Sequence, residues 1–286
     1  ENESGELTMV VETVVGLAVM SSSDGTHWSE PAPILQQARV EDFDAGAHHS
    51  PTLLYLDATR GSLNAGYHLW FVHDGQAPRQ EGQGVMQMAI LHAHSVDGLN
   101  WDHGSADLAI ETSGQYDFTA GLSSPTVART RGGGFQMWFE GHRAFNAGTV
   151  IATATTTDGL SWSVRDTAIS YEKLSDDRES LTFERDGRTS PMVVFSDGLY
   201  QLWYVGLNGA QQTLGYALSK DGVLWQRYGP VFGGDGAWEA HRIQSASFLL
   251  SAGTSESTNL ARLYYAACPS ERERIGLATR ETPVLE

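Results

Sequence analysis

The amino-acid sequence predicts an all-β protein, a five-bladed β-propeller with four antiparallel strands in each blade. Three motifs predict this fold: a Ser-Pro segment, an aromatic segment and an Asp-Gly turn followed by tryptophan, which recur in this order along the chain. Self-similar units that each hold four short strands are typical of propeller blades. We therefore expect a single propeller domain over residues 1–286.

The Ser-Pro segment opens each repeat. Ser50-Pro51, Ser124-Pro125 and Ser190-Pro191 precede apolar residues, and Ser245-Ala246 is a degenerate fourth copy. Proline is tolerated at the first residue of a strand, because no ladder hydrogen bond is needed from it there. Each segment therefore predicts the start of the first strand of a blade.

The aromatic segment predicts the second strand. It occupies residues 67–71, 135–139, 200–204 and 261–265. Aromatic and branched side chains at this density favour buried strands. A third strand of small and apolar residues, such as residues 214–218, follows each copy.

The third strand leads into a turn with the pattern [S/T]-x-D-G-x-x-W. Its aspartates are Asp24, Asp97, Asp158 and Asp221, at intervals of 73, 61 and 63 residues. Asp-Gly favours a two-residue type I′ hairpin turn, since glycine reaches positive φ without a steric clash. The tryptophan then lies on the fourth strand, where we expect it to be structural.

Four such turns and a fifth small strand at residues 275–279 give five blades. The repeats lie near 50–110, 124–170, 190–232 and 245–282, and residues 6–35 complete the ring as a short unit. The sequence leaves open whether this blade is incomplete or is closed by exchange between the ends of the chain.

The charge balance limits the possible partners. A net charge of −17 disfavours binding to nucleic acid, and no apolar run is long enough to span a membrane. Cys268 is the only cysteine, which excludes an internal disulfide and a multi-cysteine metal site. An acidic chain with two lysines indicates secretion or a saline environment, so we expect an extracellular or periplasmic monomer. A compositional bias of the lineage would give the same charge.

Carboxylates are expected at one face of the ring, where the linkers before each Ser-Pro segment meet the loops after each aromatic segment. The candidate catalytic residues are Asp44, Asp117 and Glu140. Glu140 is a carboxylate at a position where the other repeats have apolar residues, namely Val72, Val205 and Ala266. A buried carboxyl group is held toward its neutral, proton-donating form, as a general acid requires. The alternatives are a salt bridge from Glu140 to Arg143 or another arginine, and loop-capping roles for the two aspartates.

Further polar residues on the same face suit a carbohydrate or another small polar ligand. The candidate substrate-binding residues are His48, His49, His142, Arg143, Arg188, Glu239, His241 and Arg242. Histidines in this set could bind a transition metal, but adjacent strand residues such as His48 and His49 point to opposite faces. We therefore expect no metal site and no cofactor, and leave open a cation in the central channel.

In their order and composition, the three motifs resemble the five-bladed propeller glycosidases, glycoside hydrolase family 43 and its relatives such as families 32, 62 and 117. This resemblance covers the chain from about Val14 to Thr279. It implies hydrolysis of a furanoside or related sugar by an aspartate directly before a strand-opening proline and a glutamate two residues before another. The sequence diverges at these catalytic positions, where the residues directly before the prolines are Ser50, Ser124 and Ser190.

Three functions are consistent with these residues. The favoured one is a divergent glycoside hydrolase that uses displaced carboxylates, in an axial pocket, on a furanoside or oligosaccharide. The second is a carbohydrate-binding propeller without catalysis. The third is an enzyme of other chemistry that uses histidine and glutamate at the mouth of the ring.

Overall fold

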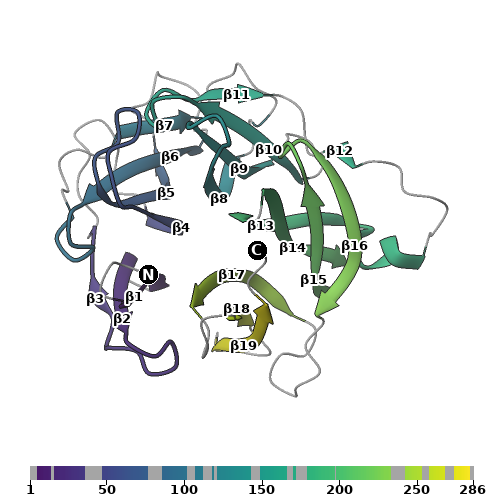
Figure 1. Ribbon diagram of the computed structural model, residues 1–286. Coiled ribbons are helices and arrows are strands. Elements are labelled where there is room, and N and C mark those ends of the chain that lie inside the picture. Colours follow the sequence, from purple (N-terminus) through teal and green to yellow (C-terminus); the bar gives the residue numbers. More distant parts are fainter. Residues whose placement is uncertain are drawn as a thin grey trace. The chain divides into compact units, whose positions relative to one another are not determined.

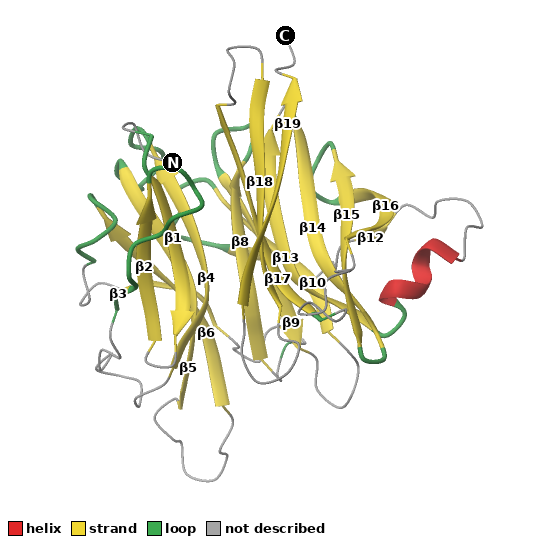
Figure 2. Ribbon diagram, turned by 90° about the horizontal axis from the view of Figure 1, so that it is seen from below, coloured by secondary structure: helices red, strands yellow, loops and turns green. Residues whose placement is uncertain are grey.

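The computed structural model describes residues 5–13, 16–35, 47–76, 86–101, 107–111, 118, 121–142, 149–165, 170–171, 179–196, 198–232, 242–252, 258–267 and 274–283. These residues form strands and turns with one short 3₁₀ helix, η1 (Glu179–Glu184) (Figure 2). None of the described segments contains a helix long and apolar enough to cross a membrane. The chain divides into two compact units, which are described in turn.

Unit 1 comprises Glu1–Gly148 and Ala152–Asp166 and contains three sheets. The first sheet holds β1 (Leu7–Thr13), β2 (Gly16–Ser22) and β3 (Ala32–Pro33). The second holds β4 (Ala47–Leu56), β5 (Gly66–Gln76), β6 (Met86–Ser95) and β7 (Asp107–Glu111). The third holds β8 (Gly121–Arg129), β9 (Phe135–His142), β10 (Thr149–Thr156), whose first three residues belong to unit 2, and β11 (Ser163–Arg165).

Unit 2 comprises Thr149–Ile151 and Thr167–Glu286 and contains two sheets. One holds β13 (Gly187–Ser196), β14 (Leu199–Asn208), β15 (Gln211–Ser219) and β16 (Leu224–Phe232), to which β12 (Ser170–Tyr171) adds a parallel edge. The other holds β17 (Ile243–Ala252), β18 (Thr258–Ala267) and β19 (Arg274–Pro283).

Each sheet is one blade, and its main strands follow one another in chain order (Figure 1). The five sheets, mainly of four antiparallel strands, confirm the predicted all-β class and the propeller arrangement. The first and last sheets contain three strands each, all from their own end of the chain. Within the described residues, strand exchange between the two ends is therefore not observed, and the first blade is short.

Apolar side chains of neighbouring blades form the core of each unit. In unit 1 they come from β2, β5 and β6 together with Trp101, which is 5% exposed. In unit 2 Trp203, Val205 and Leu214 pack against Ile243 and Tyr265 of the last blade. Burial of the aromatic strands thus explains why their motif recurs, since within each unit these side chains pack between neighbouring blades.

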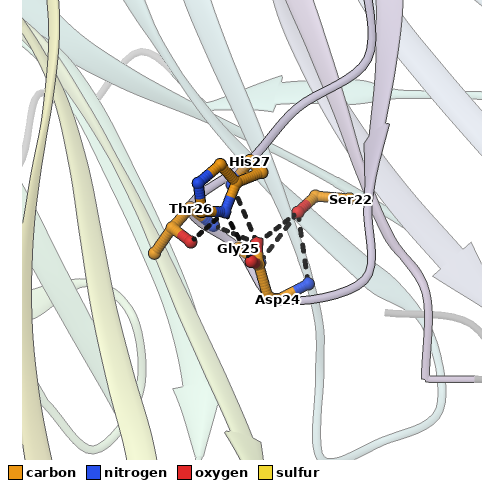
Figure 3. Close-up of polar contacts among 5 residues, drawn as sticks. All are labelled: Ser22, Asp24, Gly25, Thr26 and His27. Carbon is orange, nitrogen blue, oxygen red and sulfur yellow. Dashed lines mark hydrogen bonds and ion pairs between the residues drawn. The ribbon is translucent and has the colours of Figure 1, made fainter.

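The Asp-Gly turns differ from the two-residue type I′ turn that the sequence predicts. In Figure 3 the Asp24 carboxylate accepts hydrogen bonds from the backbone N–H groups of Thr26 and His27, at 2.7 and 2.8 Å. Ser22 Oγ accepts from the Gly25 N–H at 2.8 Å and donates to Asp24. Only the glycine has positive φ, whereas a type I′ turn needs two such residues. Side-chain capping by serine and aspartate therefore determines this turn.

The same capping recurs at Asp97, Asp158 and Asp221. The hydrogen bonds that Asp24 accepts, above all from the backbone of His27, lower the pKa of its carboxyl group well below the ordinary range. The repeated serine or threonine and aspartate are thus structural groups, which explains their regular spacing.

Gly159, in the third of these turns, gives a test of the packing between blades. Its φ is +86°, and a Cβ there would lie 2.4 Å from Cγ of the buried Leu63. Gly159→Ala is expected to cost about 1–2 kcal/mol of unfolding free energy from the backbone and about 1–3 kcal/mol more from overpacking. Urea denaturation measures this cost.

Gly133 is the matched control, because its φ is also +86° and a Cβ there meets nothing within 4 Å. Gly133→Ala should show the backbone cost alone. Equal losses for the two variants would mean that Leu63 shifts freely and that this contact does not fix the two blades.

The Ser-Pro segments lie inside their strands, which corrects the prediction that they start them. Proline is the fifth residue of β4, β8 and β13, and the register shifts by one residue at each Ser-Pro pair. The preceding serines have positive φ, as follows: Ser50 (51°), Ser124 (49°) and Ser190 (50°). Proline lacks a ladder donor and is tolerated in a sheet at such a bulge. In β17, which has alanine in place of proline, the shift lies earlier, between Ile243 and Ser245.

Candidate active site

The site is built around Glu140, whose carboxylate is buried in the third blade. Its side chain is 5% exposed, and Oε2 accepts a hydrogen bond from Ser123 Oγ at 3.0 Å. The same hydroxyl lies 2.8 Å from Nε2 of His142. Oε2 of Glu140 and Nε2 of His142 are 3.6 Å apart. One serine hydroxyl therefore bridges a carboxyl group and an imidazole.

The strand geometry explains why these three side chains meet. Glu140 and His142 are two residues apart on β9, so they point to the same face of the sheet. Ser123 lies opposite Glu140 on β8, and Gly121 lies opposite His142. Directly opposed residues on antiparallel strands have neighbouring side chains.

Phe118, which shortly precedes β8 in the chain, packs on β9. Its ring packs on Gly141, where an added Cβ would lie 2.3 Å from Cδ1, and it contacts Phe139 edge to face at 5.9 Å. Its carbonyl accepts a hydrogen bond from the Gly121 N–H. Gly141 thus lets the Phe118 ring pack closely on the face of β9 opposite to Glu140 and His142.

Chemically, the cluster can hold and move a proton. Glu140 is largely sheltered from water, whereas the side chain of His142 is 34% exposed. A carboxyl group with a hydrogen-bonded partner and restricted hydration is suited to act as an acid or a base. The structure thus brings together two of the predicted site residues, Glu140 and His142.

The other predicted histidines in unit 1 have different partners. His48 is buried, with Nδ1 3.1 Å from the carbonyl oxygen of Leu35, and its ring centroid lies 5.1 Å from that of His73. Burial, followed by the nearby His48, lowers the pKa of His73. His49 is half-buried, and its Nδ1 lies 3.0 Å from Ser50 Oγ. These contacts place His48 in the packing between β4 and β5.

The described candidates in unit 2 are Arg188 and Arg242. Arg188 Nε donates to Glu184 Oε2 at 2.8 Å, and Arg227 binds the other carboxylate oxygen. Arg242 is exposed and forms an isolated parallel bridge with Gln212. Arg188 is thus part of an ion-pair cluster around the buried carboxylate of Glu184.

Five candidates lie outside the described residues, so their proposed roles stay predictions. They are Asp44, Asp117, Arg143, Glu239 and His241. The alternative of a Glu140–Arg143 salt bridge stays a prediction for the same reason. In the part of the chain that the structure describes, no group of three or more His, Cys, Asp or Glu residues could hold a metal ion.

Ser123 is a site residue that the sequence analysis did not identify. Its signal was available, since it lies two residues before Pro125 and the neighbouring aromatic strand carries Glu140. However, the bulge at the Ser-Pro pair shifts the register, so counting back from Thr126 opposite Trp138 would have misplaced Ser123 by one residue. Glu184 and Arg227 were likewise not recognised as a pair.

Comparisons by sequence give a partial match. No protein-family model matches the chain. Uncharacterised proteins of two Mycobacterium tuberculosis strains, CDC 1551 / Oshkosh and ATCC 25618 / H37Rv, are 28% identical over 131 residues. The match covers 43% of this chain and 40% of the length of those proteins.

Comparisons by structure cover almost the whole chain. An N-acetylgalactosamine deacetylase from F. plautii, in complex with blood group B trisaccharide, has a TM-score of 0.71 at 18% identity, over 96% of this chain and 85% of that one. A thermostable family-43 glycoside hydrolase has a TM-score of 0.65 at 11% identity, with 98% and 87% covered. A GH43 endo-arabinanase from Bacillus licheniformis has a TM-score of 0.57 at 14% identity, with 98% and 91% covered. This chain therefore has the five-bladed β-propeller fold of family-43 glycoside hydrolases and related proteins.

Proposed function

We propose that this protein is a divergent glycoside hydrolase-like propeller that acts on a furanoside or an oligosaccharide, with Glu140 as an acid/base carboxyl group. The observation that carries the proposal is the buried Glu140 side chain, hydrogen-bonded to Ser123 with His142 beside it. Structural neighbours that include glycoside hydrolases support a glycosidase-like or carbohydrate-binding role.

The location of Glu140 fits that of a displaced general acid. The resemblance to family 43 implies an acid two residues before a strand-opening proline. Ser123 occupies such a position, and Glu140 is its partner on the neighbouring strand. Opposed residues on antiparallel strands have Cβ atoms about 5 Å apart, so the Glu140 carboxyl reaches the region that a glutamate at position 123 would serve.

Hydrolysis of a glycoside needs a second carboxyl group, which acts as a nucleophile or activates water. We propose Asp44 or Asp117 for this role.

Glu140→Gln tests the proposal, because glutamine keeps the shape of the side chain but cannot donate a carboxyl proton. We expect turnover to fall by about 10²- to 10⁴-fold, the usual contribution of general acid–base catalysis. The measurement is release of reducing sugar from a panel of furanosides and oligosaccharides, with circular dichroism to check the fold.

Asp57→Asn is the matched control, since it makes the same charge change at a carboxylate whose side chain is 60% exposed. It should keep full activity. Full activity of Glu140→Gln would refute the proposed role. Binding of sugars without turnover by the wild-type protein would instead support a carbohydrate-binding propeller, a result consistent with serines in place of aspartates before the prolines.

A second candidate function is hydrolysis of an acyl group on a sugar. Ser123 Oγ lies within hydrogen-bonding reach of His142 Nε2, as in a nucleophile–base pair, and one structural neighbour is an N-acetylgalactosamine deacetylase. Acetate release from N- and O-acetylated sugars, lost in Ser123→Ala, would favour this function over glycoside hydrolysis.

A further inference from the structure

Resting on the proposed role of Glu140, we propose that Ser123 and His142 form a proton relay that connects the buried Glu140 carboxyl group with solvent. Both are positioning residues, because they act on the reaction through Glu140. The inference goes beyond an acid/base role for Glu140, since it says how this carboxyl group regains its proton after each turnover.

The distances favour a bridged path over a direct one. Ser123 Oγ lies 3.0 Å from Glu140 Oε2 and 2.8 Å from His142 Nε2, both within hydrogen-bonding distance. The direct separation of Oε2 and Nε2 is 3.6 Å, which is too long for a hydrogen bond. The serine hydroxyl is therefore the element that joins the two titratable groups.

The difference in exposure between Glu140 and His142 indicates that the proton enters from solvent at His142. The Glu140 side chain is 5% exposed, and that of His142 is 34% exposed. A general acid that has protonated a leaving oxygen is left as a carboxylate and must take up a proton before the next turnover. His142 reaches water and can supply it.

The proton transfer balances as two concerted steps. His142, in its cationic form, gives the Nε2 proton to Ser123 Oγ, while Ser123 gives its own hydroxyl proton to Glu140 Oε2. The imidazole becomes neutral, the hydroxyl is regenerated and the carboxylate becomes a carboxylic acid. A hydroxyl has one proton to donate and two lone pairs to accept, so it can serve both neighbours. Water then returns a proton to the imidazole.

The backbone holds the relay in place. Ser123 precedes the bulge formed by Ser124, with φ of 49°, and Pro125, and it is paired with Glu140 across the strands. Glu140 and His142 alternate with Gly141, which Phe118 covers. All three polar groups are thus attached to strands rather than to mobile loops, as a relay requires.

The first test is spectroscopic and needs no substrate. The difference between the infrared spectra of wild type and Glu140→Gln isolates the carboxyl band of Glu140. In Ser123→Ala this band should shift, because the carboxyl group loses its hydrogen-bond donor, and Ser123→Thr should restore it. An unchanged band in Ser123→Ala would overturn the relay, whatever the substrate of the protein is.

The second test is chemical rescue of turnover. His142→Ala is expected to lower kcat by up to about 10²-fold, at the lower end of general acid–base effects. Added imidazole should restore the rate in proportion to its concentration. In Ser123→Ala the rate should fall without rescue, because the bridge itself is missing. His142→Ala without rescue, or with full activity, would overturn the relay while an inactive Glu140→Gln leaves the proposed function standing.

Discussion

Glu184→Ala is expected to lower the free energy of unfolding by about 3–5 kcal/mol, the usual cost of breaking a buried ion pair from one side. The Glu184 side chain is 1% exposed and binds Nε of Arg188 and Nη1 of Arg227. Arg227 is itself only 13% exposed. Without Glu184 its charge would remain in a poorly hydrated place with its main anionic partner gone.

Asp57 gives the matched control, because it also lies close to two arginines, Arg60 and Arg129, each at 3.6 Å. Its side chain is 60% exposed, and such pairs contribute about 0–1 kcal/mol. Urea denaturation of Asp57→Ala and Glu184→Ala should therefore show a small and a large loss. Equal losses would mean that burial does not set the cost.

A double variant separates the contribution of the two charges to stability from that of the volume that the side chains fill. Glu184→Leu combined with Arg227→Met removes both buried charges and keeps apolar volume, and such replacements are often neutral or stabilising. We expect this variant to recover most of the stability that Glu184→Ala loses. Failure to recover would assign the loss to packing of η1 rather than to charge.

Stability is also expected to fall steeply as the pH falls from 6.5 to 5, through His68 and His92. Burial lowers the pKa of His68 to about 4 and that of His92 to about 3. Below pH 6.5 the unfolded chain protonates these histidines and the folded protein does not, so the unfolded state binds more protons. Each histidine therefore removes about 1.4 kcal/mol of stability per pH unit as the pH falls from 6.5 toward its folded-state pKa.

The hydrogen bonds of this pair define which ring nitrogens carry a proton in the folded protein. His68 Nε2 lies 2.9 Å from the carbonyl oxygen of Asn64, so it must donate, and Nδ1 is left as an acceptor. His92 Nε2 donates to that Nδ1 at 2.9 Å, with the rings stacked at 5.2 Å. A proton on His68 Nδ1 would place two N–H groups against each other.

Thermal unfolding at a series of pH values checks this prediction. His92→Gln keeps an N–H donor but cannot titrate, so its Tm should fall less steeply between pH 6.5 and pH 5 than that of wild type. Above pH 7 the two proteins should show the same dependence on pH. Identical slopes in the acid range would contradict the prediction.

Most of the fold could be predicted from the sequence, because its three motifs are short, repeated and tied to single elements. The predictions that were wrong concern places where a side chain or a bulge changes the backbone hydrogen bonding that the motif alone would favour. The Asp24 side chain caps backbone N–H groups and replaces the type I′ turn that Asp-Gly alone would favour. Pro125 lies inside a strand because a bulge removes the need for its missing donor.

The site could be predicted from the sequence only by comparing equivalent positions of the repeats. Glu140 stood out, because the equivalent positions in the other blades are apolar. Its contact with Ser123 depends on a register shift that no residue count reveals. The ion pair between Glu184 and Arg227 joins η1 to β16 across 43 residues, a contact that only the folded chain produces.

The Ser-Pro bulge also bears on how such a protein can change during evolution. Side chains alternate between the two faces of a strand, so one inserted residue separates the orientation of the residues before it from that of the residues after it. In β8 the stretch before the bulge carries Ser123, and the stretch after it carries the buried Val127 and Ala128. Mutations can thus alter the polar side chains at one end of the strand while the residues at the other end stay packed in the core. A new activity can arise in one blade without a compensating change in its neighbours.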